Sequence, residues 1–85
     1  MKKVFTVFDS KAGVFMQPFY AVSSGVAERQ FLAAVMDSEH EFHRFAEDYT
    51  LFELAKYDEE SGKFENLESP RSLLNAAVAK ALRRS

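Results

Sequence analysis

Residues 49–67 read YTLFELAKYDEESGKFENL, and this stretch predicts a β-hairpin. Its first part, residues 49–57, is rich in aromatic and aliphatic side chains and is typical of a strand. The polar run 58–62 ends in Gly62, a residue that readily adopts the positive φ angle of a tight reversal. Residues 63–67 then form a short returning strand. The hairpin gives the chain an antiparallel strand pair on which the other elements pack.

A second hairpin is predicted near the N-terminus. Residues 4–8 (VFTVF) are β-branched and aromatic, and the polar cluster 9–13 (DSKAG) that follows ends in a glycine. Residues 14–21 (VFMQPFYA) form the second strand, and the short connection favours antiparallel pairing. Pro18 has no backbone N–H to donate, so this strand is expected at a sheet edge or at a bulge.

Two helices complete the predicted fold. The run Ser23-Ser24-Gly25 offers an N-cap for a helix over residues 25–37, and Ser69-Pro70 offers a cap and first helical residue for a helix that ends near Arg83. Residues 38–48 have weak periodicity and are expected to form a loop or one short helical turn. The sequence predicts a single α+β domain over residues 1–85, with the order ββαββα and an antiparallel sheet with two helices.

Both faces of the N-terminal hairpin are apolar, and this leaves two arrangements open. A solvated sheet face carries polar residues at alternate positions, so this hairpin needs cover on both faces. Either one helix covers each face, or both helices pack on one face and the other presents aromatic rings to a second subunit or to stacked bases. We expect Phe5, Phe15 and Phe19 to be the rings concerned, with ordinary core packing as the competing interpretation.

Composition limits the class of protein. The chain has 85 residues and no cysteine, so neither a disulfide framework nor a cysteine-ligated metal is expected, and a reducing compartment suits it. The longest uncharged stretch is interrupted by polar residues, glycine and proline, and the first residues lack a sustained apolar run, so neither a membrane span nor a signal peptide is predicted. The expected location is the cytoplasm of the cell that makes the protein.

The residues that would support catalysis or cofactor binding are sparse. The three glycines are isolated, so no phosphate-binding loop is present, and no nucleophile is accompanied by a recognisable triad. His40 and His43 lie among glutamates and would ligate a metal only if they converged with those carboxylates, which leaves a metal-dependent nuclease as a weak alternative. We predict no enzymatic activity, no cofactor and no metal site.

The charge is unevenly distributed along the chain. The net charge is −2, but residues 1–36 and 69–85 are net basic, whereas residues 37–68 are strongly acidic. Nucleic-acid binding through phosphate contacts requires the basic side chains of both chain ends to meet on one surface. The competing interpretation is an ordinary solvated surface and, at the C-terminus, a helix end whose cations complement its dipole. The candidate phosphate contacts are Lys2, Lys3, Lys11, Arg71, Lys80, Arg83 and Arg84.

Several strings of the sequence, in a fixed order, are similar to one family. These are FDSKA at residues 8–12, MQPF at 16–19, EDYTLFEL at 47–54 and GKFENL at 62–67. Together they resemble the small nonstructural protein of gokushoviruses, which are single-stranded DNA phages of the Microviridae. The resemblance covers most of the chain and is weakest over residues 38–46. Ala55 stands where a glycine is expected in that pattern.

The resemblance implies a DNA-binding accessory protein that acts in phage genome replication, at the switch to single-stranded genome synthesis and packaging. Its location would then be the host bacterial cytoplasm, and its partner single-stranded DNA. The family pattern transfers no catalytic or DNA-contacting residue, so the candidate sites depend on charge and aromatic placement alone. A homodimer is expected. The alternative is a non-enzymatic interaction module that binds a phage replication protein, a procapsid protein or a host replication factor.

Overall fold

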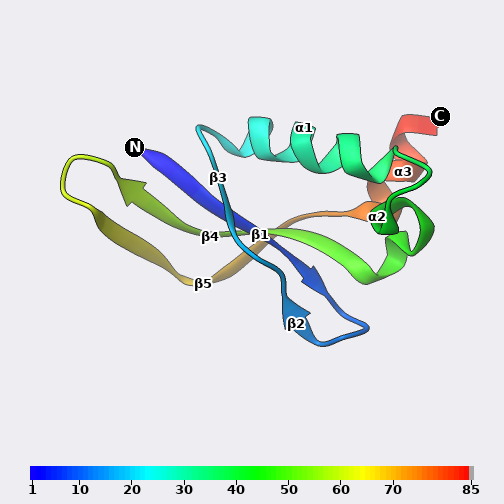
Figure 1. The fold of residues 1–85 in the computed structure, drawn as a ribbon, viewed down its shortest axis with the longest axis horizontal. Helices are drawn as coiled ribbons and strands as arrows, with labels where there is room; N and C mark the ends of the chain where they lie inside the picture. The colour runs from blue at the N-terminus through cyan, green and yellow to red at the C-terminus, as the bar shows by residue number, and fades with distance from the viewer. Residues whose placement is uncertain (85) are drawn as a thin grey trace.

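The computed structural model describes residues 1–84, with side chains through Arg83. It is a small α+β domain in which all strand pairs are antiparallel, so the predicted fold class is confirmed (Figure 1). The order differs in detail, because the second predicted strand is split in two, whereas the short helical turn that was one of the two expectations for residues 38–48 is formed. The elements are β1 (Lys2–Asp9), β2 (Val14–Phe15), β3 (Phe19–Ala21), α1 (Ser24–Val35), α2 (Glu41–Arg44), the 3₁₀ turn η1 (Ala46–Asp48), β4 (Tyr49–Asp58), β5 (Lys63–Asn75) and α3 (Ala76–Arg84).

The sheet is built outward from its two central strands, β1 and β4. Its order is β2-β1-β4-β5, and β3 pairs with β1 on the same side as β2. The predicted hairpin over residues 49–67 is the β4–β5 pair, and Gly62 has the positive φ of +73° that its turn requires. Gly13 has the same role after β1, with φ +74°. Both predicted hairpins are therefore confirmed.

A break at Gln17 and Pro18 separates β2 from β3. Phe15 pairs with Phe8 and Phe19 pairs with Phe5. The β2–β3 segment therefore uses four residues where β1 uses three. The extra residue is a bulge, as Pro18 predicts, and it reverses the alternation of side chains. Phe15 and Phe19 consequently point to opposite faces of the sheet, and the prediction that they share one face is wrong.

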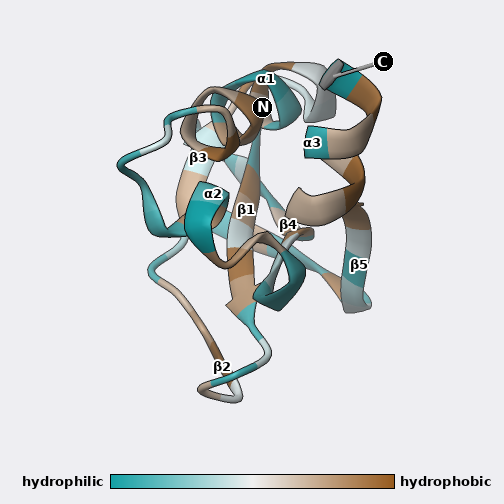
Figure 2. Ribbon diagram, turned by 90° about the vertical axis from the view of Figure 1, so that its right-hand side faces the viewer, coloured by the Kyte–Doolittle hydropathy of each residue, from teal (hydrophilic) through white to brown (hydrophobic). Residues whose placement is uncertain are grey.

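The helices pack on one face of the sheet. In Figures 1 and 2, α1 and α3 lie beside each other on the same side of the strands, and the β1–β2 hairpin extends away from them. The Ser23 hydroxyl caps α1 by accepting the N–H of Val26, as the sequence predicts. The core forms between these helices and the sheet, and its members include Phe5, Val7, Ala27, Phe31, Val35, Phe42, Tyr49, Leu51, Ala76 and Ala79.

The last helix begins later than the sequence predicts. Residues 69–74, which were expected in its first turns, instead extend β5, and α3 starts at Ala76. Asn75 makes this transition, because its side-chain oxygen accepts the N–H of Ala77 while its amide nitrogen donates to the hydroxyl of Thr50. Pro70 lies in an irregular part of β5 with no paired partner, where its missing N–H costs no ladder hydrogen bond.

Candidate nucleic-acid interface

The sheet face opposite the helices, here called the open face, carries most of the aromatic residues that are not in the core. Residues that are directly opposite across paired strands project to the same face, so the register assigns the members of this face. Six of them are aromatic and only Lys2 is charged. They are Lys2, Val4, Thr6 and Phe8 on β1, Phe15 on β2, Tyr20 on β3, Thr50, Phe52, Ala55 and Tyr57 on β4, and Phe64, Asn66, Ser72 and Asn75 on β5.

The six rings form two separate groups. One, the phenylalanine end, consists of Phe8, Phe15 and Phe52, with ring centroids 4.7 Å apart for Phe8 and Phe15 and 5.5 Å apart for Phe15 and Phe52. The other, the tyrosine end, joins residues of three strands. Its centroids are 5.7 Å apart for Tyr20 and Tyr57 and 4.9 Å apart for Tyr57 and Phe64. These distances lie in the range of favourable aromatic pairs.

The rings shield the small residues of the open face and remain partly exposed themselves. Val4, Thr6 and Ala55 are buried although no helix among residues 1–84 covers this face. In contrast, Phe15, Tyr20 and Phe64 expose 46%, 49% and 54% of their surface. The open face is therefore a solvent-facing aromatic surface, which corresponds to the second of the two arrangements left open by the sequence.

The predicted ring residues are only partly on this surface. Phe15 lies on it, but Phe5 is completely buried beneath the helices and Phe19 packs against the same core, so ordinary core packing is the correct interpretation for these two. Sequence reasoning did not name the other five rings of the open face. Strict alternation along β4 would even put Tyr57 on the face opposite Phe52. The register is shifted at Leu54 in the pairings of β4 with both β1 and β5, and this bulge brings the two rings to one face.

Two of the candidate cations converge on a buried carboxylate. Glu53 exposes only 2% of its surface, and its Oε1 accepts a hydrogen bond of 2.6 Å from the Nη2 of Arg71. Its other oxygen, Oε2, lies 4.0 Å from the Nζ of Lys3. A buried charge requires such compensation. Arg71 and Lys3 are thus placed together, and they neutralise a carboxylate of the protein itself.

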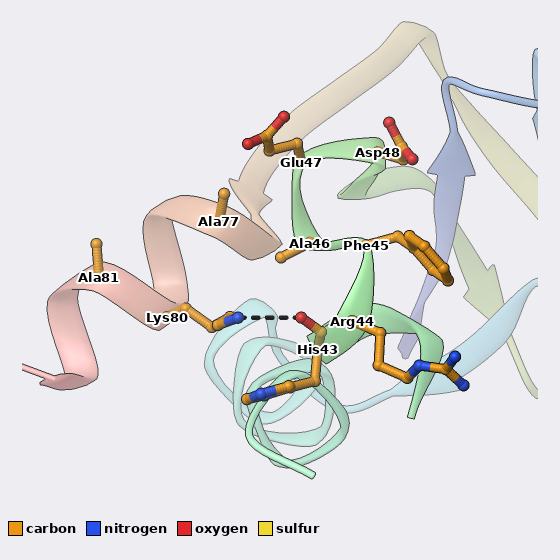
Figure 3. Close-up of a pocket in the computed structure, with 9 residues that line it drawn as sticks. All are labelled: His43, Arg44, Phe45, Ala46, Glu47, Asp48, Ala77, Lys80 and Ala81. Carbon is orange, nitrogen blue, oxygen red and sulfur yellow. Dashed lines mark hydrogen bonds between the residues drawn. The ribbon is translucent and has the colours of Figure 1, made fainter. Parts of the chain in front are cut away.

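The other candidate cations are spread over the molecule. Lys2 pairs with Glu59 at 3.8 Å at one end of β1, whereas Lys11 lies in the turn beyond the other end of this strand, which is roughly 23 Å long at 3.3 Å per residue. Lys80 donates a 3.0 Å hydrogen bond to the backbone oxygen of His43 (Figure 3). Arg83 is exposed on α3, and the side chain of Arg84 lies outside the described part of the chain. The expected single basic patch is therefore not formed by the described side chains.

Both histidines have local structural roles. The Nδ1 of His40 caps α2 by accepting the N–H of Phe42, and the Nδ1 of His43 lies 2.9 Å from the backbone oxygen of Val35. No group of three or more histidine, aspartate or glutamate side chains within residues 1–84 is arranged to hold a metal ion. The carboxylates of this region do not converge with the two imidazoles.

A shallow groove of about 460 Å³ lies between α3 and the segment that contains α2 and η1 (Figure 3). Lys80 and Ala77 line one side, and Arg44, Glu47 and Asp48 line the other. The ammonium group of Lys80 is already hydrogen-bonded across it. The charges along this groove are of mixed sign, and they select for neither an anion nor a cation.

The fold and the open face define a small α+β protein whose helices cover one side of the sheet and leave an aromatic surface on the other. A family model described as "Phage ORF5 protein" matches residues 2–79, and the chain belongs to that family. It is therefore a phage protein. No curated protein and no solved structure matches the chain. Within residues 1–84, no helix combines the length and the apolar character needed to cross a membrane.

Proposed function

We propose that this phage protein binds single-stranded DNA through the open face and acts as a non-enzymatic accessory factor in genome replication, or in the switch to single-stranded genome synthesis and packaging. The replication role comes from the resemblance to the gokushovirus nonstructural protein, and the site of action is then the host bacterial cytoplasm. The observation that carries the binding proposal is the set of six rings on a helix-free sheet face.

Aromatic rings on a sheet face suit single strands because every base has a stackable face. Each stacked base contributes about 1–3 kcal/mol to binding and requires no particular sequence. In a duplex the bases already stack on one another, so no base is free to stack on partly exposed rings such as Tyr20, Phe64 and Phe15. The proposal therefore predicts a preference for unpaired strands of any sequence.

The charge distribution favours binding in which stacking contributes more than phosphate neutralisation. Lys2 is the one charged residue that the register assigns to the open face, and the net charge of the chain is −2. For single strands, the slope of log affinity against log salt is about −0.7 per neutralised phosphate. One or two phosphate contacts would give a slope of about −1, and an affinity in the micromolar range is expected.

The test is fluorescence anisotropy with a labelled oligo(dT) of about 30 nucleotides, long enough for several binding sites. Binding at low salt, a shallow salt dependence and weaker binding to the matching duplex are expected. The proposal is rejected if tens of micromolar protein in low salt leave the anisotropy of the single strand unchanged.

A second candidate function, a protein-interaction module, is favoured by the exposed residues on either side of Phe15. Val14, Phe15 and Met16 are consecutive, uncharged and exposed, which is typical of a protein contact. The partner would be a second copy, a phage replication or procapsid protein, or a host factor. Under this function Phe15→Glu abolishes dimerisation or partner capture while the monomer stays folded, and oligonucleotide binding is absent in the wild type.

A further inference from the structure

We infer that the tyrosine end binds one nucleotide of the strand, with its base stacked on the rings and its phosphate on Lys2. Glu59 competes with this phosphate for the lysine. This inference rests on the proposed function and adds to it the position of the site, a phosphate contact and an internal competitor. Nothing in the sequence pattern distinguishes Glu59 from its acidic neighbours.

The register puts the lysine and the rings side by side. Lys2 is directly opposite Tyr57 on the open face, and Tyr57 is directly opposite Phe64 on the next strand. Side chains in such pairs have Cβ atoms about 5 Å apart. Tyr20 completes the group from the other side of β1, through its ring contact with Tyr57. An ammonium group and stackable rings are thus within the span of a single nucleotide.

The phenylalanine end lacks this combination. Phe8, Phe15 and Phe52 pair with one another and with uncharged residues of the open face, and no lysine or arginine of that face lies opposite them. Its rings have no polar atoms, whereas Tyr20 and Tyr57 carry hydroxyl groups that can hydrogen-bond to a base or a phosphate. The tyrosine end therefore fits a nucleotide better than the phenylalanine end does.

Glu59 presents a negative charge where a phosphate would bind. Its Oε2 lies 3.8 Å from the Nζ of Lys2 and its Oε1 lies 3.7 Å from the N-terminal ammonium group, and the side chains of Glu59 and Lys2 are about half exposed. Exposed pairs of this kind contribute little to stability and are readily exchanged for another anion. The carboxylate thus lowers the affinity of Lys2 for phosphate without fixing the lysine permanently.

The first experiment compares two substitutions in the same turn. Glu59→Gln and Glu60→Gln remove the same charge from adjacent exposed residues, but Glu60 makes no ion pair within the described part of the chain. Glu59→Gln should tighten oligo(dT) binding about twofold to fivefold, the range of a surface ion pair, and Glu60→Gln should change it less. In a Lys2→Gln background the effect of Glu59→Gln should be smaller, because only the N-terminal ammonium group is then released. Equal effects of the two substitutions, or a gain from Glu59→Gln that is undiminished in the Lys2→Gln background, would overturn the inference.

The second experiment uses the intrinsic fluorescence of the protein. The chain has no tryptophan and three tyrosines, of which Tyr20 and Tyr57 are at the tyrosine end and Tyr49 is in the core. Oligo(dT) should therefore quench the tyrosine emission. Phe64→Leu should weaken binding about tenfold, as expected for a lost stacking contact, and the matched substitution Phe15→Leu at the other end should weaken it less than Phe64→Leu does. Both residues are about half exposed, so each variant should fold.

The results separate the inference from the function on which it rests. Absence of binding by the wild type rejects the proposed function and the inference together. Binding that is unaffected by Phe64→Leu and Glu59→Gln but lost in Phe15→Leu leaves single-strand binding in place and moves the site to the phenylalanine end, which rejects only the inference.

Discussion

At the scale of single residues, the contact between Arg71 and Glu53 shows that a candidate DNA-binding cation instead neutralises a carboxylate of the protein. Arg71 holds this buried carboxylate with a 2.6 Å hydrogen bond. Removing one partner leaves a buried charge uncompensated. We expect Arg71→Ala to lower the free energy of unfolding by about 2 kcal/mol, discounted from the value for fully buried pairs because the arginine side chain itself is 59% exposed. Urea unfolding measures this. A loss below about 0.5 kcal/mol, the level of an ordinary surface substitution, would contradict the structural role of Arg71.

The Asp58 carboxylate in the β4–β5 turn has a role that depends on pH. Its pKa is lowered from the ordinary value of 3.8, chiefly by the backbone N–H of Glu60 and then by the hydroxyl of Ser61. A lowered pKa in the folded state means that the carboxylate stabilises the turn above pH 3.8 and that this stabilisation is lost as the pH falls through the lower folded value. The chemical shift of the Glu60 amide should follow this titration. In Asp58→Asn the same pH-dependent step should be absent, and its persistence there would contradict the assignment.

At the scale of elements, the junction between β5 and α3 shows that tertiary contacts can shift a helix start that the local sequence predicts. Ser69 and Pro70 form a good local start signal for a helix, but β4 offers pairing as far as Asn75, and the strand continues. The amide of Asn75 contacts Thr50 and the backbone oxygen of Tyr49, contacts that are remote in sequence. Local pattern alone cannot reveal them, whereas the Ser23 cap and the Gly62 turn depend on neighbouring residues and were correctly predicted.

This junction leads to a paired prediction. Asn75→Ala removes the cap of α3 and the amide contacts to β4, and it should lower stability by about 1–2 kcal/mol, the usual range for a lost N-cap. Ser69→Ala changes the residue expected from sequence to be the cap, which is exposed in β5, and should stay within about 0.5 kcal/mol of the wild type. Thermal or urea unfolding of both variants tests this. A larger loss for Ser69→Ala than for Asn75→Ala would contradict the observed helix boundary.

At the scale of the whole molecule, the sequence predicts that a sheet face can expose aromatic rings, but it does not predict which rings lie on that face. Aromatic residues in the N-terminal hairpin indicated that one face could remain open. Two bulges, at Leu54 and at Gln17 and Pro18, then determine which rings reach it, and each moves side chains by one position relative to simple alternation. The positions of the cations depend in the same way on remote carboxylates, since Glu53 and Glu59 hold lysines and an arginine from distant parts of the chain.

The most direct test of the central claim is an aromatic ¹H–¹³C NMR titration with unlabelled oligo(dT). The account predicts that the ring signals of Tyr20, Tyr57 and Phe64 shift, because bases stack on them, while those of Phe5, Phe31 and Phe42 in the helix-covered core stay in place. Shifts confined to rings other than those of the open face, or no shift at saturating oligonucleotide, would contradict it.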